Sequence, residues 1–423
     1  MAISLEEAIN LVEQGEAEEG LNKLSKLQAT LHDEEKFLLA DKYYEWGLPD
    51  KALDLLADLH LLYPQETDIS LLMAEAYIDM EQEDEAISIL DQVSKDDPAY
   101  PQALLLQADL YQLQGLQEVS ESKLKEAKKL LPDEPLIDFA LGEFYYHSGD
   151  DKTSISYYEK AALSAEVFAG VNINQRLADA LSGSGEFEAA MPYYEKTINE
   201  KIDPHSVFGY GLAALRAGQT KTAIQQLENL KELDPGFSSL YLPLARAYEE
   251  EGMLQESQET ALEGIKEDEF NKDLYLFAGK ISLKNQQPDK AVQLLREAAA
   301  IDPGHAEAVL TLANIYLHQE QFQAIIDLLT EVMKFEEEDP QYFWLLGKSY
   351  NETENFSQAL DYYDRAYKFF KDQTDFLEEY ARFLLEEGNR QKAMELFRKI
   401  LSLDPANVEI EALLMHLEDE LKQ

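Results

Sequence analysis

The chain of 423 residues contains no cysteine. This absence excludes disulfide bonds, thiolate metal ligands and cysteine nucleophiles, and it leaves the redox compartment undetermined. Glycine and proline are also few, with 19 and 14 residues, so the sequence has little room for long loops. Hydrophobic residues make up 45% and aromatic residues 10% of the chain, which is more than a disordered protein contains. The composition therefore predicts a folded protein.

Basic residues are scarce as well. The chain has 36 lysines and arginines against 84 aspartates and glutamates, which gives a formal net charge of −48. Such a field repels phosphate backbones and anionic lipids, so the composition disfavours binding to nucleic acid or to a membrane surface. A basic partner, or simple solubility, accounts better for the acidic excess.

No stretch of the sequence approaches the roughly 18 consecutive apolar residues of a membrane-spanning helix. The first twenty residues, MAISLEEAINLVEQGEAEEG, lack the basic start and the apolar run of a signal peptide. We therefore expect a soluble cytoplasmic protein without membrane insertion.

Motifs that carry chemistry are also missing. The seven histidines are scattered, and no two of them stand at the spacing of metal ligands. The sequence has no glycine-rich phosphate loop, no nucleophile elbow and no zinc-binding helix motif. Acidic pairs are abundant, but a spacing match carries little information among 84 carboxylates. We therefore expect a protein that is not an enzyme and that holds no metal or cofactor.

A repeat of about 34 residues covers the chain. Small residues recur inside apolar helical patterns at intervals of 32, 34, 34, 34, 36 and 33 residues, and then five times at 34. This first small column is Ala8, Ala40, Ala74, Ala108, Gly142, Ala178, Gly211, Ala245, Gly279, Ala313, Gly347 and Ala381. A second small column, twelve residues further on, is Gly20, Ala52, Ala86, Ser120, Ser154, Ala190, Ala223, Ser257, Ala291, Ile325, Ala359 and Ala393, in which only Ile325 is not small. Twelve tandem units are therefore expected.

One unit shows what the columns do. Between residues 340 and 373 the spacing i, i+3, i+4, i+7 places one apolar stripe on each of two helices. The stripes are Phe343, Leu346, Gly347 and Tyr350, and then Ala359, Tyr363 and Ala366. Small residues at 347 and 359 allow two antiparallel backbones to approach closely. The stripe also places Phe343 inward, and its neighbour Trp344 on the flank.

These residues resemble the pattern of the tetratricopeptide repeat (TPR) family, and the chain as a whole is also similar to the YpiA-like TPR proteins of Gram-positive bacteria. The resemblance implies an all-α, right-handed superhelical solenoid of about twelve helix-turn-helix repeats, followed by a capping helix. The longer interval near residues 165 to 185, where Asn174 replaces the usual aromatic, predicts a weaker joint. A slightly irregular repeat in one continuous solenoid is the alternative. We expect an N-terminal lobe at 1–170 (repeats 1 to 5), a C-terminal lobe at 171–407 (repeats 6 to 12) and the cap at 408–423.

In TPR proteins the first helices line a concave groove where partner peptides bind, so the resemblance places the candidate site on that face. The groove column next to the first small column changes sign along the chain. It contains Asp41, Glu75, Asp109, Glu143 and Asp179, then Leu212, and then Arg246, Lys280, Asn314, Lys348 and Arg382. Two explanations stay open for the basic run: a locally basic lobe, or bases that pair with neighbouring groove residues such as Glu352 and Glu386.

A flank column, which includes Phe208 and Trp344, is almost entirely apolar. It either packs neighbouring first helices together or forms pockets for partner side chains, with Trp344 as an anchor. One TPR subclass grips C-terminal carboxylates with lysine and asparagine, and Leu71 and Glu75 stand here instead, which argues against that binding mode.

The sequence thus predicts a non-catalytic scaffold or adaptor that binds a protein or peptide partner in the groove. An acidic segment would bind at Arg246, Lys280, Lys348 and Arg382, and a basic segment along Asp41 to Asp179. The alternative function is a regulator whose two lobes close around a peptide signal. Homo-oligomerisation stays open.

Overall fold

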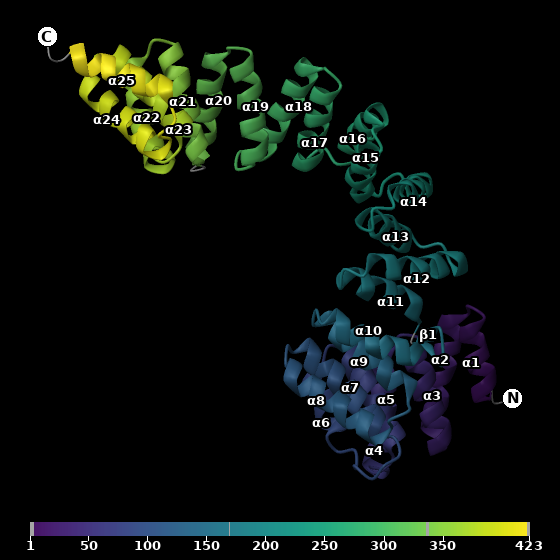
Figure 1. Cartoon of the computed structure of the whole chain (residues 1–423). Helices are drawn as coiled ribbons and strands as arrows, with labels where there is room; N and C mark the ends of the chain where they lie inside the picture. The colour runs from purple at the N-terminus through teal and green to yellow at the C-terminus, as the bar shows by residue number, and fades with distance from the viewer. Residues whose placement is uncertain (1–3, 169, 336–337, 421–423) are drawn as a thin grey trace. The chain divides into compact units, whose positions relative to one another are not determined.

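The computed structural model describes residues 4–168, 170–335 and 338–420, which leaves out the outermost residues of the first expected lobe and of the expected cap (Figure 1). The chain divides into two compact units, Met1–Ile202 and Asp203–Gln423. This division falls after the twelfth helix, whereas the sequence places the lobe boundary at 170/171. The lobes at those boundaries stay a prediction.

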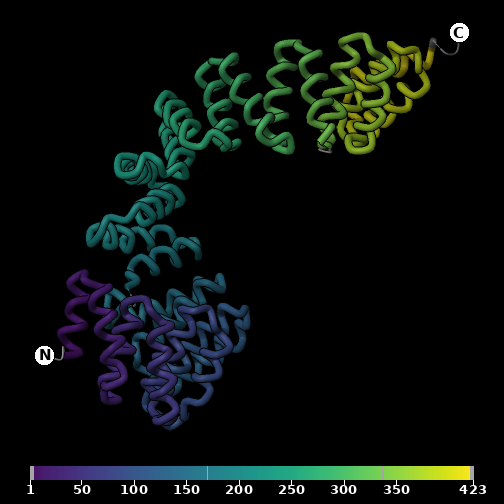
Figure 2. The backbone as a smooth tube through the Cα atoms, turned by 180° about the vertical axis from the view of Figure 1, so that it is seen from behind, coloured from purple at the N-terminus to yellow at the C-terminus, as the bar shows by residue number. Residues whose placement is uncertain are grey.

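The first unit contains six helical hairpins. Their helices are α1 (Leu5–Glu13), α2 (Ala17–Leu27), α3 (Asp33–Glu45), α4 (Pro49–Leu62), α5 (Thr67–Asp79), α6 (Glu83–Leu90), α7 (Tyr100–Leu113), α8 (Gln117–Leu130), α9 (Pro135–His147), α10 (Asp151–Ala162), α11 (Ile173–Gly183) and α12 (Phe187–Glu200). A short 3₁₀ turn, Gln28–Thr30, follows α2. Figure 2 shows the same succession from behind.

The second unit contains six more hairpins and a final single helix. The helices are α13 (Pro204–Arg216), α14 (Thr220–Leu233), α15 (Tyr241–Glu250), α16 (Leu254–Glu267), α17 (Lys272–Lys284), α18 (Pro288–Ile301), α19 (Ala306–His318), α20 (Phe322–Val332), α21 (Pro340–Glu352), α22 (Phe356–Phe370), α23 (Thr374–Glu386), α24 (Arg390–Leu403) and α25 (Val408–Glu420). Short 3₁₀ turns precede α15 (Ser238–Leu240) and follow α20 (Met333–Phe335).

Each odd-numbered helix from α1 to α23 packs against the even-numbered helix that follows it. Within each unit, the even-numbered helices from α4 to α10 and from α14 to α24 also pack against the next odd-numbered helix. The described residues therefore form six successive hairpins in the first unit, and six more plus α25 in the second, which confirms the predicted all-α repeat fold. The final helix covers the last hairpin by burying Ile410 against α23 and α24, together with most of Leu414 and Leu417.

Both small columns lie where the two helices of a hairpin touch. Every residue of both columns is buried, including the exceptional Ile325. The approach is close: a Cβ atom added to Gly142 would lie 2.4 Å from a ring carbon of Tyr158, and one added to Gly347 would lie 3.0 Å from Tyr363. At Ser257 the hydroxyl donates a hydrogen bond of 2.7 Å to the backbone oxygen of Ala245, across the same contact.

A third periodic position, seven residues after the first small column, forms the turn inside each hairpin. Every residue at this position has a positive φ, between 56° and 92°. Glycine supplies this left-handed conformation in eight hairpins, because it has no Cβ to clash with the following carbonyl. The other four are Glu81, Gln286, Glu320 and Glu354. This column therefore marks the turn even where glycine is absent.

The longer interval near residue 170 contains a small structure that the sequence did not predict. Two short antiparallel strands, β1 (Val167–Phe168) and β2 (Val171–Asn172), connect α10 to α11. The ring of Phe168 stacks on that of Phe139 in α9 at 5.2 Å between centroids. The insertion thus packs against the preceding hairpin. Asn174, at the usual aromatic position, is itself buried.

The close contact between paired helices predicts a strong dependence on side-chain size. We expect Ala74→Leu, in the first small column, to lower the free energy of unfolding by roughly 1–3 kcal/mol, because added methylenes overpack a filled contact. Ala57→Leu is the matched control, since Ala57 is exposed on α4 and should change stability by less than about 0.5 kcal/mol. Urea denaturation followed by circular dichroism measures both, and equal stabilities would contradict the packing argument.

Candidate functional site

Three carboxylates follow one another on neighbouring first helices of the first unit. Asp41 lies on α3, Glu75 on α5 and Asp109 on α7, and α5 contacts both α3 and α7. Each stands one position after a buried small residue, so the repeat brings all three to the same face. We call these three residues the acidic strip.

The acidic strip has no internal counterion. Among the described residues, no basic side chain lies within 4 Å of its carboxylates. Lys42, which adjoins Asp41 along the chain, pairs with Glu45 at 2.6 Å and with Glu13 at 3.8 Å instead. The strip therefore carries uncompensated negative charge.

Two residues of the strip, Glu75 and Asp109, have raised pKa values. Burial, and then the charges of Asp41 and Asp79, raise the pKa of Glu75 above its usual range. Desolvation, and then the charge of Glu143, raises the pKa of Asp109 to about 6. Although Asp109 is exposed at its surface, surrounding protein removes part of the water that would stabilise its charge. Burial and the neighbouring acids Asp79 and Glu75 likewise raise the pKa of Tyr44 to about 12.

The other two predicted acids of the groove column have partners. The guanidinium of Arg176 contacts both carboxylate oxygens of Glu143, with N–O distances of 2.8 and 3.1 Å, and the hydroxyl of Tyr158 donates to the same group at 2.5 Å. Asp179 accepts a hydrogen bond of 2.8 Å from Tyr194. These two carboxylates are therefore engaged within the protein and differ from the acidic strip.

Three of the four predicted bases also have partners in the following repeat. Lys280 forms an ion pair with Glu307, and Lys348 lies 3.5 Å from Glu379. Arg382 contacts Glu378 at 2.7 Å and Glu409 at 2.8 Å.

The residues four positions further along the same helices, such as Glu352 and Glu386, are not these partners. Sequence reasoning missed the partners because most of them lie two helices further on, as Glu307 on α19 does from Lys280 on α17. The shared interval of 27 residues in Lys280–Glu307 and Arg382–Glu409 is a signal that it could have used. Arg246 is exposed on α15, and no carboxylate among the described residues lies within ion-pair distance of it.

The apolar flank column mainly packs against the chain itself. Phe343 is buried, whereas Trp344 is only partly buried and contacts the rings of Phe370 and Phe376 at 5.4 and 5.3 Å. Its indole nitrogen donates to Glu379 at 3.0 Å. Phe208 packs on Phe237 at 5.1 Å in the same way.

One pocket of about 330 Å³ nevertheless brings three predicted site residues together. Asn314, Trp344 and Lys348 line it, from α19 and α21, with Phe370 and Glu379 beside them. The pocket combines an aromatic wall with the amides of Asn314, Gln341 and Gln373 and with the ion pair of Lys348 and Glu379. Sequence reasoning predicted Asn314, Trp344 and Lys348 separately as site residues but did not predict that they line one pocket.

The described residues contain no group of three or more histidines, aspartates and glutamates that could hold a metal ion. In the same part of the chain, no helix combines the length and the apolar character needed to cross a membrane.

Family models match most of the chain. Residues 112–164 match the model described as YpiA-like tetratricopeptide repeats, and residues 340–407 match the YpiA-like C-terminal tetratricopeptide repeats. General tetratricopeptide repeat models match residues 43–110 and 282–348, and also 176–236 and 242–306.

The TPR repeat-containing protein YpiA of Bacillus subtilis (strain 168) is 49% identical over 419 residues, which cover 99% of this chain and 99% of that protein. Among solved structures, the C-terminal part of a TPR repeat-containing protein from Cytophaga hutchinsonii is 15% identical, with a TM-score of 0.42, over 65% of this chain and 98% of that one. YrrB, described as a TPR protein with an unusual peptide-binding site, is 17% identical, with a TM-score of 0.38, over 44% of this chain and 96% of that one. The match to YpiA along nearly the full length of both chains, together with the repeat models, shows that this chain belongs to the YpiA-like family of tetratricopeptide repeat proteins.

Proposed function

We propose that this protein is a non-catalytic scaffold or adaptor that binds a basic segment of a partner protein along the acidic strip. TPR proteins generally mediate interactions between proteins, which supports the broad class. The acidic strip is the single observation that carries the choice of partner, because Asp41, Glu75 and Asp109 have no cationic partner among the described residues. A lysine-rich or arginine-rich segment would supply the missing positive charges.

The raised pKa values support the same choice. Glu75 and Asp109 pay a free-energy cost for being charged beside other carboxylates in partly desolvated positions. A bound cation would relieve that cost, whereas no such gain is available where the acids are already paired. Residues at which charge lowers stability in the free protein are reasonable candidates for binding sites.

The basic run of the second unit is less suited to an acidic partner. Lys280, Lys348 and Arg382 already contact carboxylates, so an acidic segment would have to displace those contacts. Arg246 and the pocket lined by Asn314 and Trp344 remain candidate contacts for an acidic segment of a partner.

The remaining parts of the proposal follow from charge and family. We place the protein in the cytoplasm, without membrane insertion, nucleic-acid partner or cofactor. A formal net charge of −48 supports the exclusion of nucleic acid. The regulator whose two lobes close around a peptide signal stays an alternative prediction, and so does self-association.

Reversing the charge of the strip tests the proposal directly. The probe is a 12-residue peptide of arginine, glycine and serine, titrated into the full chain by calorimetry at low and at moderate salt. We expect Asp41→Lys/Glu75→Lys/Asp109→Lys to weaken binding at least about tenfold, since several close charge pairs are lost and replaced by repulsion.

The matched control is Asp54→Lys/Asp84→Lys/Glu118→Lys. These three acids are exposed on the second helices of the same three hairpins, so the change in net charge is identical. Binding to the control variant should fall much less. An equal loss in both variants would show attraction to net charge alone, and absence of binding to the unmodified chain would overturn the proposal.

The raised pKa of Asp109 also predicts a pH dependence of stability. The carboxyl of Asp109 has a pKa near 3.8 in the unfolded chain and about 6 in the folded chain, so the folded chain holds its proton more tightly. Ionisation of Asp109 therefore lowers the free energy of unfolding as pH rises from about 4 to about 6. Asp109→Asn should therefore be more stable than the unmodified protein at pH 7, and equal to it below pH 4.

We expect Asp109→Asn to raise the free energy of unfolding at pH 7 by about 1 kcal/mol. The full rise of the pKa from 3.8 to about 6 would correspond to roughly 3 kcal/mol, but Asp109 is exposed at its surface, so water screens part of this effect. Urea denaturation at several pH values measures it. Asp84→Asn, at an exposed position of α6, is the matched control and should give no gain in stability at pH 7. A gain that does not change with pH would contradict the assignment.

A further inference from the structure

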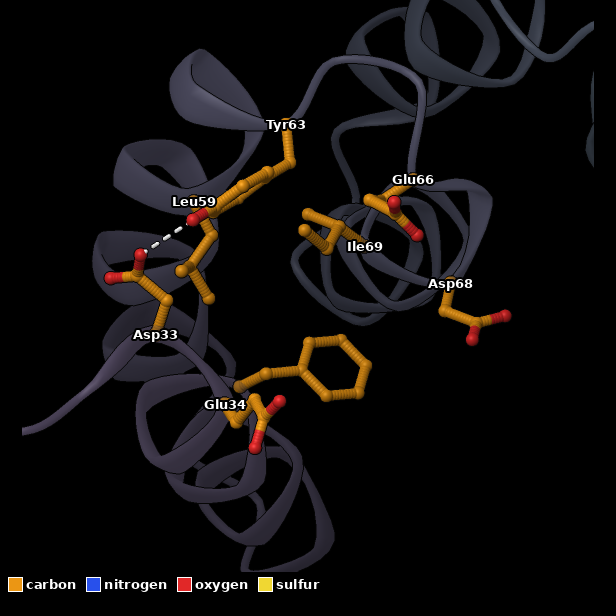
Figure 3. Close-up of a pocket in the computed structure, with 8 residues that line it drawn as sticks. Asp33, Glu34, Leu59, Tyr63, Glu66, Asp68 and Ile69 are labelled. Carbon is orange, nitrogen blue, oxygen red and sulfur yellow. Dashed lines mark hydrogen bonds between the residues drawn. The ribbon is translucent and has the colours of Figure 1, made fainter.

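A cavity of about 440 Å³ opens between the second and third hairpins, at the N-terminal ends of α3 and α5 (Figure 3). Its inner wall is apolar, formed by Phe37, Leu59 and Ile69. Leu59 and Ile69 are buried, and Phe37 is partly buried. The cavity therefore offers an apolar floor that the chain does not fill.

Carboxylates surround this floor. Asp33 and Glu34 lie on the α3 side, and Glu66 and Asp68 lie on the α5 side, as Figure 3 shows. Asp33 accepts a hydrogen bond of 2.8 Å from the hydroxyl of Tyr63, and Lys36 lies 3.4 Å from it. No cation among the described residues lies within ion-pair distance of the other three carboxylates.

The ninth hairpin, α17 and α18, provides an internal reference for this arrangement. Equivalent residues lie 239 positions further along the sequence, as Ala40 and Gly279 show. There Lys272 and Asp302, the equivalents of Asp33 and Tyr63, form an ion pair. Asp273 and His305, the equivalents of Glu34 and Glu66, lie 3.2 Å apart, a pair that is ionic when the histidine is protonated.

The third pair completes the comparison. Lys280 and Glu307, which form an ion pair, are the equivalents of Asp41 and Asp68. At each of these three places the ninth hairpin sets a basic or imidazole side chain beside an acid. The positions equivalent to those three bases carry the acids Asp33, Glu66 and Asp41 instead. Because Asp41 belongs to the acidic strip, the equivalence with Lys280 and Glu307 predicts that Asp68 connects the cavity to the strip.

We propose that this cavity binds the side chain of an arginine from the partner protein. Its aliphatic stem packs on Phe37 and Ile69, and its guanidinium lies among the carboxylates of Glu34, Glu66 and Asp68, in place of the cations of the ninth hairpin. This proposal rests on the proposed binding of a basic segment. It adds that one arginine of that segment anchors it in the cavity.

Arginine suits the cavity because its guanidinium stacks on an aromatic face and only donates hydrogen bonds, which the surrounding carboxylates accept. The chain itself contains such an arrangement. The guanidinium of Arg365 lies 4.1 Å from the ring centroid of Phe343, and it contacts the carboxylate of Glu338 at 2.9 Å. An aromatic ring with a nearby carboxylate is thus a combination that this fold already uses to hold arginine.

The experiment follows the methyl signal of Ile69 by NMR during titration with the arginine–glycine–serine peptide, with the signal assigned through Ile69→Val. We expect the arginine peptide to shift this signal. A peptide with citrulline in place of arginine keeps the shape of the side chain but loses its charge, so it should leave the signal unchanged. Glu34→Gln/Asp68→Asn should weaken binding about tenfold. Phe37→Leu, the residue type at the equivalent Leu276, should weaken it about threefold because the aromatic face is lost.

The matched control is Asp50→Asn/Asp84→Asn. Both residues are exposed acids in the first turns of α4 and α6, so this pair matches Glu34 and Asp68 in charge and in their favourable position at a helix start. It should change affinity by less than about twofold. One outcome separates the two proposals. If charge reversal of the strip abolishes binding, but the cavity variants change neither the affinity nor the shift of the Ile69 signal, the arginine site in the cavity is wrong and the proposed function stands. If the unmodified chain does not bind the peptide, both fail.

Discussion

The close contact between the two helices of each hairpin is the constraint on which the rest of the structure depends. At this contact the residues of both small columns are buried, and even one methyl group added at Gly142 would lie 2.4 Å from Tyr158. Because the backbones approach so closely, the residue next to each small residue has a fixed direction. The register of the packed core therefore also sets which residues lie on the exposed face beside it.

A repeat makes each surface position comparable with eleven others, and this comparison separates structural charge from free charge. In the second unit, basic side chains on first helices pair with acids on the first helix of the next hairpin, as Lys280 on α17 does with Glu307 on α19. At the equivalent position of the second hairpin, Asp41 replaces the lysine, and the acid it would have paired with is still present as Asp68. Carboxylates without a cationic partner thus stand together at particular positions of the first unit, and we propose this arrangement as a binding surface for a basic segment.

The same comparison explains why the predicted basic run does not make the second unit a simple binding site for acids. Three of its four bases neutralise carboxylates of the next repeat, so their charge contributes to contacts between repeats. Similarly, Trp344 packs on Phe370 and Phe376 and donates to Glu379, so only part of its ring is available to a partner. Function in this fold is therefore decided less by which residue types are present than by which of them have partners within the chain.

The sequence by itself determined the twelve hairpins, the buried small columns and the inward direction of Phe343 beside the partly buried Trp344. All of these depend on helical periodicity over a few residues, which a 34-residue repeat shows twelve times. Only the tertiary structure decided the partners of Lys280, Glu143 and Arg382, the strand pair at Val167–Asn172, and the cavity beside Phe37. The pairs Lys280–Glu307, Glu143–Arg176 and Arg382–Glu409 join residues 27 to 33 positions apart, so packing of one hairpin on the next sets their distances. The strand pair is local in sequence, but its residues form no helical repeat pattern that could have indicated it.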